Sequence, residues 1–357
     1  MRRAIALAAL ADGRTHPNPM VGAIVVRKGR IVGEGFHRQA GLPHAEAIAL
    51  RQAGRKAMGA ILYVTLEPCC HRGRTPPCTD AIISAGIDRV VYGMRDPNPL
   101  VRGRGIKSLR AGGVRVTGPV AERECRALNP AYLYWMNTGR PYVIAKVGIT
   151  LDGKLADRSG NSQWITNAAA RAYTHEWRAR VDGICVGWRT FLHDRPRLTV
   201  RLPRYRGPQP RPVILANGIG LPSRSLRRPM GHARPPLWVL PQGTTTLARH
   251  LTQRGHEVLL CPHREGRFVI ATLLRSLASR GIGSLMVEGG AHTLSTFLQA
   301  RAVQYLVIGI GPLLLGGEGL GWTDRLSIPS LRKAPRLAVA AWRRFGDNVV
   351  VEGRVRN

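Results

Sequence analysis

Apolar positions in the first third of the chain alternate between short continuous runs and helical spacing. Continuous runs are typical of buried strands, and apolar residues three and four positions apart are typical of helices. Ala45, Ile48 and Ala49 have the helical spacing. The pattern predicts strands at 21–26, 31–33, 60–66, 88–92 and near Val114, and helices at 44–52, 79–85 and 106–111. Helices that alternate with short apolar strands favour a layered α/β domain.

A second domain is predicted from about residue 140 onwards. Residues 119–140 have a helical, connecting pattern, and a new apolar run starts at Pro141. We therefore divide the chain into domains at 1–140 and 141–357. The second domain has predicted strands at 141–147, 183–187, 212–216, 237–240, 257–261, 284–288, 304–310 and 348–355, and helices at 269–279 and just before 304. Segments 202–212 and 222–236 are rich in Pro and Arg, and we expect them to be loops inserted between elements.

Neither a membrane span nor a signal peptide is predicted. No run of eighteen apolar residues occurs. The apolar stretch after Arg3 breaks at Asp12 and continues directly into motif sequence, so cleavage there would remove part of the domain. A first amphipathic helix explains this stretch.

The chain is strongly basic, with a formal net charge of +33 over 357 residues. This charge raises the hypothesis of a nucleic-acid-binding protein. However, 48 of the 54 basic residues are Arg, which is typical of compositional bias, and both domains carry the excess. We therefore expect attraction to phosphate-bearing small molecules and no nucleic acid partner.

Three of the six cysteines lie within ten residues, at Cys69, Cys70 and Cys78. The other three are scattered, so the pattern indicates a metal site and not a disulfide framework. A reducing cytoplasm is the compartment that we expect.

His44, Glu46, Cys69 and Cys78 form the strongest chemical signal in the sequence. A zinc ion that activates water needs three protein ligands and one open position, and one imidazole with two thiolates supplies that set. Glu46 can move a proton near the open position without binding the metal. His-x-Glu followed by Pro-Cys is typical of zinc nucleobase deaminases, but their usual second Cys would fall at Arg72.

Alternative ligand sets stay open at this point. Cys70 is adjacent to Cys69 and is a poor second ligand, whereas His71 is an alternative one. A purely structural zinc would want four closed ligands and would have no use for Glu46.

The motifs around these residues resemble the bifunctional deaminase–reductases of riboflavin biosynthesis. They are His16-Pro-Asn-Pro-Met-Val-Gly22, Pro43-His-Ala-Glu46, Thr65-Leu-Glu-Pro-Cys-Cys-His-Arg-Gly-Arg-Thr-Pro-Pro-Cys78, Asp96-Pro-Asn-Pro99 and Gly103-Arg-Gly105. The family carries the same insert before Cys78. The resemblance implies zinc on His44, Cys69 and Cys78, Glu46 as the catalytic proton shuttle, and deamination of a diaminopyrimidinone that bears a phosphoribosylamino group. It also implies that Asn18 binds this substrate, although a plain turn residue between two prolines is the alternative for Asn18.

By itself, the second half is less informative about function. It lacks G-x-G-x-x-G, so a Rossmann dinucleotide site is not indicated. Val287-Glu-Gly-Gly-Ala291 lies between a predicted strand and a predicted helix, where backbone N–H groups could approach a phosphate. A simple strand-to-helix turn explains these residues equally well.

The family resemblance extends to this half and implies a dihydrofolate-reductase-like α/β domain after a three-layer cytidine-deaminase-like domain. It implies that NADPH is bound by Gly148, Trp164, Thr190, Asp194, Gly290, Ala291, His292, Thr293, Leu294, Ser295 and Thr296. It implies that the substrate of the reductase is bound by Lys146, Ser162, Arg178, Leu198, Arg201 and Glu288. Hydride transfer to the ring-opened ribosyl carbon would give a ribitylamino product. The chain departs from the family at Arg195, where an acidic or amide residue is usual.

Three functional hypotheses follow. The bifunctional enzyme, with zinc, NADPH and a small phosphoribosyl pyrimidine, explains both sets of motifs, and we expect it to be a cytoplasmic homo-oligomer. A nucleic-acid-editing deaminase with a basic accessory domain would explain the charge, but the chain has few aromatic residues for stacking bases. A deaminase with an inactive reductase domain would explain Arg195.

Overall fold

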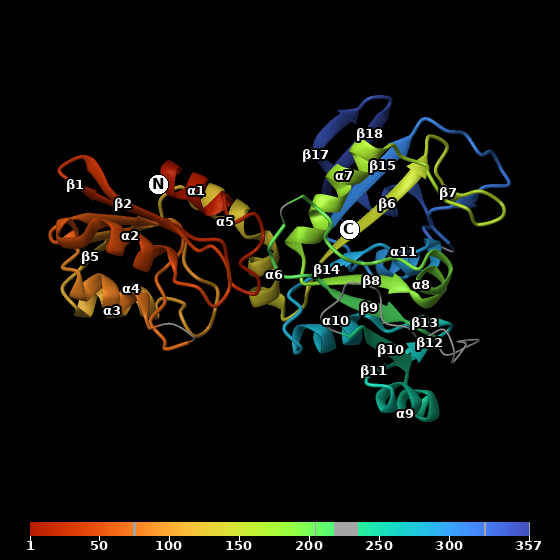
Figure 1. Cartoon of the computed structure of the whole chain (residues 1–357), viewed down its shortest axis with the longest axis horizontal. Helices are drawn as coiled ribbons and strands as arrows, with labels where there is room; N and C mark the ends of the chain where they lie inside the picture. The colour runs from red at the N-terminus through yellow and green to blue at the C-terminus, as the bar shows by residue number, and fades with distance from the viewer. Residues whose placement is uncertain (74–75, 204, 218–234, 325, 357) are drawn as a thin grey trace. The chain divides into compact units, whose positions relative to one another are not determined.

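A computed structural model describes residues 1–73, 76–203, 205–217, 235–324 and 326–356. The chain forms two compact units, residues 1–139 and 140–357. Figure 1 shows the elements of each unit. In the described part of the chain, no helix has the length and apolarity that crossing a bilayer requires.

The first unit is a five-stranded sheet with helices on both faces (Figure 1). The strand order is β2-β1-β3-β4-β5, in which β1 pairs antiparallel with β2 and β3, and the other pairs are parallel. The strands are β1 (Gly22–Arg27), β2 (Arg30–Phe36), β3 (Ile61–Val64), β4 (Arg89–Tyr92) and β5 (Arg115–Thr117). The α-helices are α1 (Arg2–Ala9), α2 (Ala45–Ala53), α3 (Cys78–Ser84), α4 (Arg104–Ala111), α5 (Glu122–Leu128) and α6 (Pro130–Thr138).

The side chains on the two faces of β1 pack against different helices of this unit. Ala23 and Val25 belong to the core that includes α2, α3 and α4, whereas Ile24 packs against Ala4 and Leu7 of α1. Successive side chains of a strand point to opposite faces, so this sheet is buried on both sides. The predicted three-layer domain is confirmed.

The second unit is built on a nine-stranded sheet of order β11-β10-β9-β8-β14-β6-β15-β18-β17. The pairs from β11 to β15 are parallel, and β18 and β17 add an antiparallel edge. Its strands are β6 (Tyr142–Thr150), β8 (Gly183–Gly187), β9 (Arg211–Leu215), β10 (Leu237–Pro241), β11 (Glu257–Cys261), β14 (Ser284–Val287), β15 (Tyr305–Gly311), β17 (Arg336–Phe345) and β18 (Asn348–Arg356). Short two-stranded pairings join β7 (Lys154–Ala156) to β16 (Leu320–Gly321) and β12 (His263–Arg264) to β13 (Arg267–Phe268).

The described part of the second unit also has five α-helices. They are α7 (Ala168–Glu176), α8 (Trp188–Asp194), α9 (Thr245–Gln253), α10 (Ile270–Ala278) and α11 (Ala291–Gln299), with 3-10 turns η2 (Trp177–Arg180) and η4 (Leu331–Lys333). Leu273 and Leu277 of α10 and Leu294 and Phe297 of α11 pack in one core with β6. The predicted α/β class is confirmed for this unit as well.

Most of the predicted elements agree with the structure within one or two residues. The sequence analysis did not predict α7, α8, α9 or β17. The first of these helices begins after Asn167, whose side chain accepts a hydrogen bond from the N–H of Ala170, which is a typical N-cap. The predicted loop 222–236 lies mostly outside the described residues.

Gly311, at the end of β15, allows the segment around Trp164 to pack on the sheet. A Cβ atom at position 311 would lie 1.8 Å from the backbone oxygen of Ile165. Because a backbone atom cannot rotate away, any larger residue would displace this segment.

We expect Gly311→Ala to lower the free energy of unfolding of the second unit by about 1–3 kcal/mol, because the added methyl group overpacks the site. Gly317→Ala is the matched control, since a Cβ there would meet no atom within 4 Å. Urea denaturation of both variants measures the difference. Equal stability of the two would contradict the proposed close contact.

Candidate functional site

His44, Cys69 and Cys78 converge on one point in the first unit. His44 is the N-cap residue of α2, Cys78 is the first residue of α3, and Cys69 lies in the loop after β3. The three ligand atoms lie within 4.8 Å of one another. His44 Nδ1 is 3.3 Å from Cys78 Sγ and 3.5 Å from Cys69 Sγ.

This arrangement is suited to zinc by its donor chemistry and its spacing. Tetrahedral Zn–N and Zn–S bonds of ordinary length place nitrogen and sulfur about 3.5 Å apart. The pKa of the Cys69 thiol is lowered, because Cys78 and His44 donate hydrogen bonds to its sulfur and His44 contributes charge. A lowered thiol pKa favours the thiolate, which is the form that binds metal.

The alternative ligands do not join this group among the residues that the structure describes. The only group of three or more potential ligands found there is His44, Cys69 and Cys78. Cys70 Sγ instead lies 3.8 Å from the backbone oxygen of Leu100. His71 lines the neighbouring cavity.

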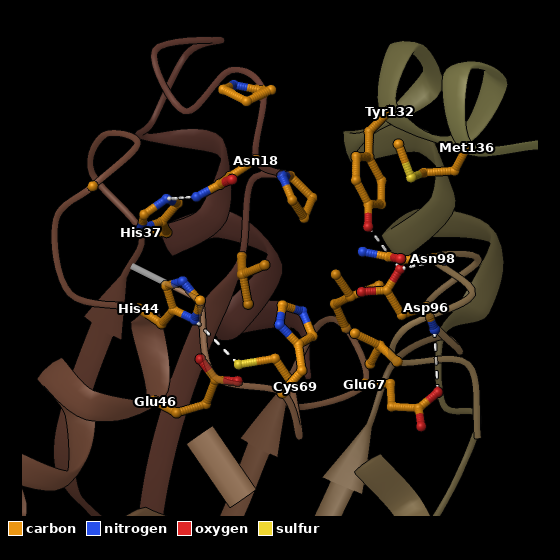
Figure 2. A pocket seen from close by; sticks show the side chains of 18 of the residues that line it. Asn18, His37, His44, Glu46, Glu67, Cys69, Asp96, Asn98, Tyr132 and Met136 are labelled. Atoms are coloured by element: carbon orange, nitrogen blue, oxygen red, sulfur yellow. Dashed lines mark hydrogen bonds between the residues drawn. The ribbon is translucent and has the colours of Figure 1, made fainter. Parts of the chain in front are cut away.

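Glu46, in the first turn of α2, lies beside His44 and Cys69 (Figure 2). Its side chain is buried, and burial raises its pKa to about 7. A cavity of about 380 Å³ adjoins Glu46, His44 and Cys69. A carboxyl group in this position can exchange a proton with a molecule in the cavity.

Asn18 lines the same cavity and is held by His37, which the sequence analysis did not identify. Asn18 Nδ2 lies 3.1 Å from His37 Nε2, and His37 Nδ1 lies 3.2 Å from the backbone oxygen of Pro43. Burial lowers the pKa of His37, so the ring is neutral: Nδ1–H donates to Pro43, and Nε2 accepts from Asn18. The side chain of Asn18 is therefore fixed at the wall of the cavity.

Asp96, Asn98 and Tyr132 form the opposite wall (Figure 2). The hydroxyl of Tyr132 donates to Asp96 Oδ1 at 2.7 Å, and the N–H of Asn98 donates to the same oxygen at 2.9 Å. Burial raises the pKa of Asp96 to about 6. The sequence analysis noted the motif 96–99 only as part of the family resemblance.

Glu67 fixes the loop that carries this wall. Its carboxylate accepts hydrogen bonds from the backbone N–H groups of Asp96 at 3.3 Å, Gly103 at 3.1 Å and Ile106 at 3.2 Å. The side chain is buried. One carboxylate thus joins the strand–loop segment before Cys69 to the start of α4.

The second unit holds a buried cluster of charges around Glu288, directly after β14. Arg178, in η2, donates from Nε to Glu288 Oε1 at 2.8 Å and from Nη2 to Oε2 at 2.5 Å. Burial alone would raise the pKa of Glu288, but the charges of Arg178 and Lys146 lower it to about 2. Burial lowers the pKa of Lys146, which lies in β6, whereas Glu288 raises it.

The chain segment that contains Leu198 and Arg201 contacts this cluster at Thr199. Arg178 Nη1 donates to the backbone oxygen of Thr199 at 3.0 Å. Leu198 is fully buried, and Arg201 is more exposed than Arg178. The structure thus brings together four of the predicted substrate residues, Lys146, Arg178, Arg201 and Glu288, and Leu198 directly precedes Thr199 in the chain.

Ser162 and Trp164 lie in the segment between β7 and α7. The Trp164 side chain is 65% exposed, and the guanidinium of Arg171 stacks over its ring at 4.1 Å. A pocket of about 300 Å³ beside Trp164 includes Thr166, Arg171 and Leu313.

Thr190, Gly290 and Thr293 meet where β8 and β14 end. A Cβ at Gly290 would lie 3.4 Å from Thr190 Oγ1, and a Cβ at Gly187 would lie 2.8 Å from Thr293 Oγ1. Gly290 is the N-cap residue of α11, so the first N–H groups of the helix open toward this junction. Gly148 lies on the next strand, β6, opposite Gly309 of β15.

The remaining predicted cofactor residues differ in exposure. Thr293, Leu294, Ser295 and Thr296 have buried side chains, and Leu294 belongs to the core. His292 is exposed, and Ala291 is half-buried. Asp194 is exposed at the end of α8, where it pairs with His193 at 2.9 Å, and Arg195 has a left-handed φ of 44°. The N–H of Leu294 already donates to the Gly290 oxygen at 3.1 Å, so in this stretch only the N–H groups up to Thr293 lack an acceptor within the helix.

Comparisons with known proteins agree with this architecture. Residues 1–94 match the family model of the cytidine and deoxycytidylate deaminase zinc-binding region, and residues 141–351 match that of the RibD C-terminal domain. The riboflavin biosynthesis protein RibD of Aquifex aeolicus (strain VF5) is 42% identical, over 98% of this chain and 96% of its own length. RibD of Escherichia coli (strain K12) is 40% identical over 98% and 96% of the two chains.

Solved structures show the same relationship. Acinetobacter baumannii RibD, form 2, has a TM-score of 0.89 at 34% identity and covers 99% of this chain and 97% of its own. A diaminohydroxyphosphoribosylaminopyrimidine deaminase/5-amino-6-(5-phosphoribosylamino)uracil reductase from Thermotoga maritima has a TM-score of 0.83 at 36% identity, covering 100% and 97%.

A zinc-binding deaminase region followed by a reductase domain defines a bifunctional enzyme. The chain belongs to the RibD family of riboflavin biosynthesis proteins, and it is both a deaminase and a reductase. Its two activities use zinc and NADPH.

Replacement of Glu67 tests the wall of the deaminase cavity. Glu67→Gln keeps one acceptor oxygen for three N–H donors, so at least one buried N–H loses its partner. We expect the free energy of unfolding to fall by about 1–3 kcal/mol, and the KM of deamination to rise because Asp96 and Asn98 shift.

Glu122→Gln is the control for this variant, because Glu122 is exposed and its ion pair with Arg126 at 3.6 Å is a surface pair. Urea denaturation and steady-state deamination compare the two variants. A Glu67→Gln protein that matches the control in both measurements would contradict the role of the carboxylate.

Proposed function

We propose that residues 1–140 deaminate 2,5-diamino-6-(5-phosphoribosylamino)pyrimidin-4-one and that residues 141–357 reduce the ribosyl group of the resulting uracil to ribityl with NADPH. The observation that carries the proposal is the convergence of His44, Cys69 and Cys78 beside the buried carboxyl group of Glu46. The substrate assignment is supported by the Thermotoga maritima relative, whose name specifies a deaminase and a reductase of these compounds.

In the deaminase, His44, Cys69 and Cys78 would hold zinc, and Glu46 would be the catalytic proton shuttle. Zinc bound by three protein ligands supplies Lewis-acid activation of water. Glu46 takes a proton at its carboxylate from the water that adds to the amine-bearing ring carbon. It returns this proton to the amine nitrogen, and the C–N bond breaks with release of ammonia. Asn18, fixed by His37, holds the pyrimidine ring against the cavity wall.

In the reductase, the charged cluster around Glu288 would bind the phosphoribosyl substrate. Arg178 is occupied by its bidentate pairing with Glu288, so Arg201 is the guanidinium that is available for the phosphate dianion. Lys146 lies beside Glu288 and contributes a second charge within the site. Ser162 and Leu198 complete the proposed set of substrate residues.

NADPH would bind at the junction of β8, β14 and α11. Its pyrophosphate suits the N-terminus of α11 at Gly290 and the hydroxyl of Thr190 close by. Gly148 and Trp164 would lie beside the nicotinamide. Asp194 and the stretch Ala291–Thr296 complete the proposed set, in which the first turn of α11 contributes backbone N–H groups that have no acceptor within the helix.

The substrate class sets the expected partners. The enzyme acts on a small molecule, and the absence of a nucleic acid partner, assembly into a homo-oligomer and a cytoplasmic location stay predictions. Sedimentation of the purified protein, with and without RNA, measures the first two.

Glu46→Gln tests whether the two activities belong to separate domains. The amide cannot accept the proton, so we expect at least a thousandfold loss of ammonia release. NADPH oxidation with the deaminated substrate should be unchanged, because the reductase residues lie in the other compact unit.

Mass analysis of the products with each substrate distinguishes the outcomes. Equal loss of both activities in a folded protein would contradict two separate sites. Normal ammonia release would contradict the role of Glu46. Failure of the wild-type protein to oxidise NADPH would contradict the reductase assignment and favour the inactive reductase domain that Arg195 suggested.

A further inference from the structure

Side chains hold the segment Leu198–Arg201, which pairs with no strand among the residues that the structure describes. Gln209 pairs with Val200 on both sides: its Oε1 accepts the Val200 N–H at 2.7 Å, and its Nε2 donates to the Val200 oxygen at 3.3 Å. Arg178 donates to the Thr199 oxygen at 3.0 Å. Leu198 has a φ of 50°, which is unfavourable for an L-residue, so the segment depends on these contacts for its conformation.

His175 provides the contact at Arg201. Its Nε2 accepts the backbone N–H of Arg201 at 2.7 Å. His175 and Arg178 are three positions apart, in the last turn of α7 and in η2, so that one helical face can present both side chains. This face therefore holds residues 199 and 201 of the same segment.

Burial and the surrounding charges keep His175 neutral. Burial, together with the charges of Arg178, Arg201 and Lys146, lowers its pKa to about 4, although the charge of Glu288 acts in the opposite direction. A neutral ring can accept a hydrogen bond at Nε2, whereas a protonated ring could only donate. His175 is therefore an acceptor for the segment and not a further cation for a phosphate.

We propose that His175 is a positioning residue of the reductase, which fixes the backbone of Arg201 and so the place where its guanidinium meets the substrate phosphate. This proposal rests on the proposed function, in which Arg201 binds the phosphate. His175 itself does not contact the substrate.

The test compares His175→Leu with His175→Gln. Leucine has a similar size but no acceptor, so we expect the KM for 5-amino-6-(5-phosphoribosylamino)uracil to rise about tenfold, the effect of losing one hydrogen bond. The KM for NADPH and the rate of ammonia release should not change. Glutamine offers an oxygen at a similar reach, so His175→Gln should have a KM within about threefold of the wild type.

A double-mutant cycle with Arg201→Ala separates positioning from a general structural role. If His175 acts through the Arg201 guanidinium, adding His175→Leu to Arg201→Ala should raise the substrate KM no further. Should His175→Leu fail to fold, His175→Asn makes the same comparison, because its shorter amide does not reach the Arg201 N–H.

Each remaining outcome has a distinct meaning. An unchanged substrate KM in the His175 variant, or effects that add in the double variant, would overturn the positioning role while leaving the proposed function intact. An unchanged KM in Arg201→Ala alone would overturn both the phosphate-binding role of Arg201 and the proposal built on it.

Discussion

The deaminase depends on the gathering of one imidazole and two sulfur atoms at a single point. His44 and Cys78 come from the starts of two helices, α2 and α3, and Cys69 comes from the loop after β3. Their spacing matches a tetrahedral metal centre. Because Glu46 lies in the first turn of α2, the helix that begins after the proposed imidazole ligand also sets the position of Glu46, the proposed proton shuttle.

In each proposed site, a buried carboxylate whose oxygens both accept hydrogen bonds fixes the surrounding segments. Glu67 accepts three backbone N–H groups and holds the wall that bears Asp96. Glu288 accepts both arms of the Arg178 guanidinium. Buried carboxylates are costly unless they are paired in this way, so each fixes the local geometry around it. Arg201 is left more exposed than Arg178, as a phosphate ligand should be.

The sequence was sufficient for most of the elements, for the fold class and for the proposed ligand residues that the structure brings together. His44, Glu46, Cys69 and Cys78 stand out because the chemistry restricts both residue type and spacing. Glu67, His37 and His175 could not be found in this way, because their partners lie at backbone positions that only the fold brings near. The burial of the side chains at 293–296 could not be predicted either, since a motif does not reveal which groups of a helix face a ligand.

Metal analysis of the purified protein is the most direct test of the central claim. We expect about one zinc per chain in the wild type and in Cys70→Ser, because Cys70 is outside the ligand group. Cys78→Ser should lose most of the zinc, since serine replaces one of the three ligands. A wild-type protein without zinc, or a Cys78→Ser protein that retains it fully, would contradict the account.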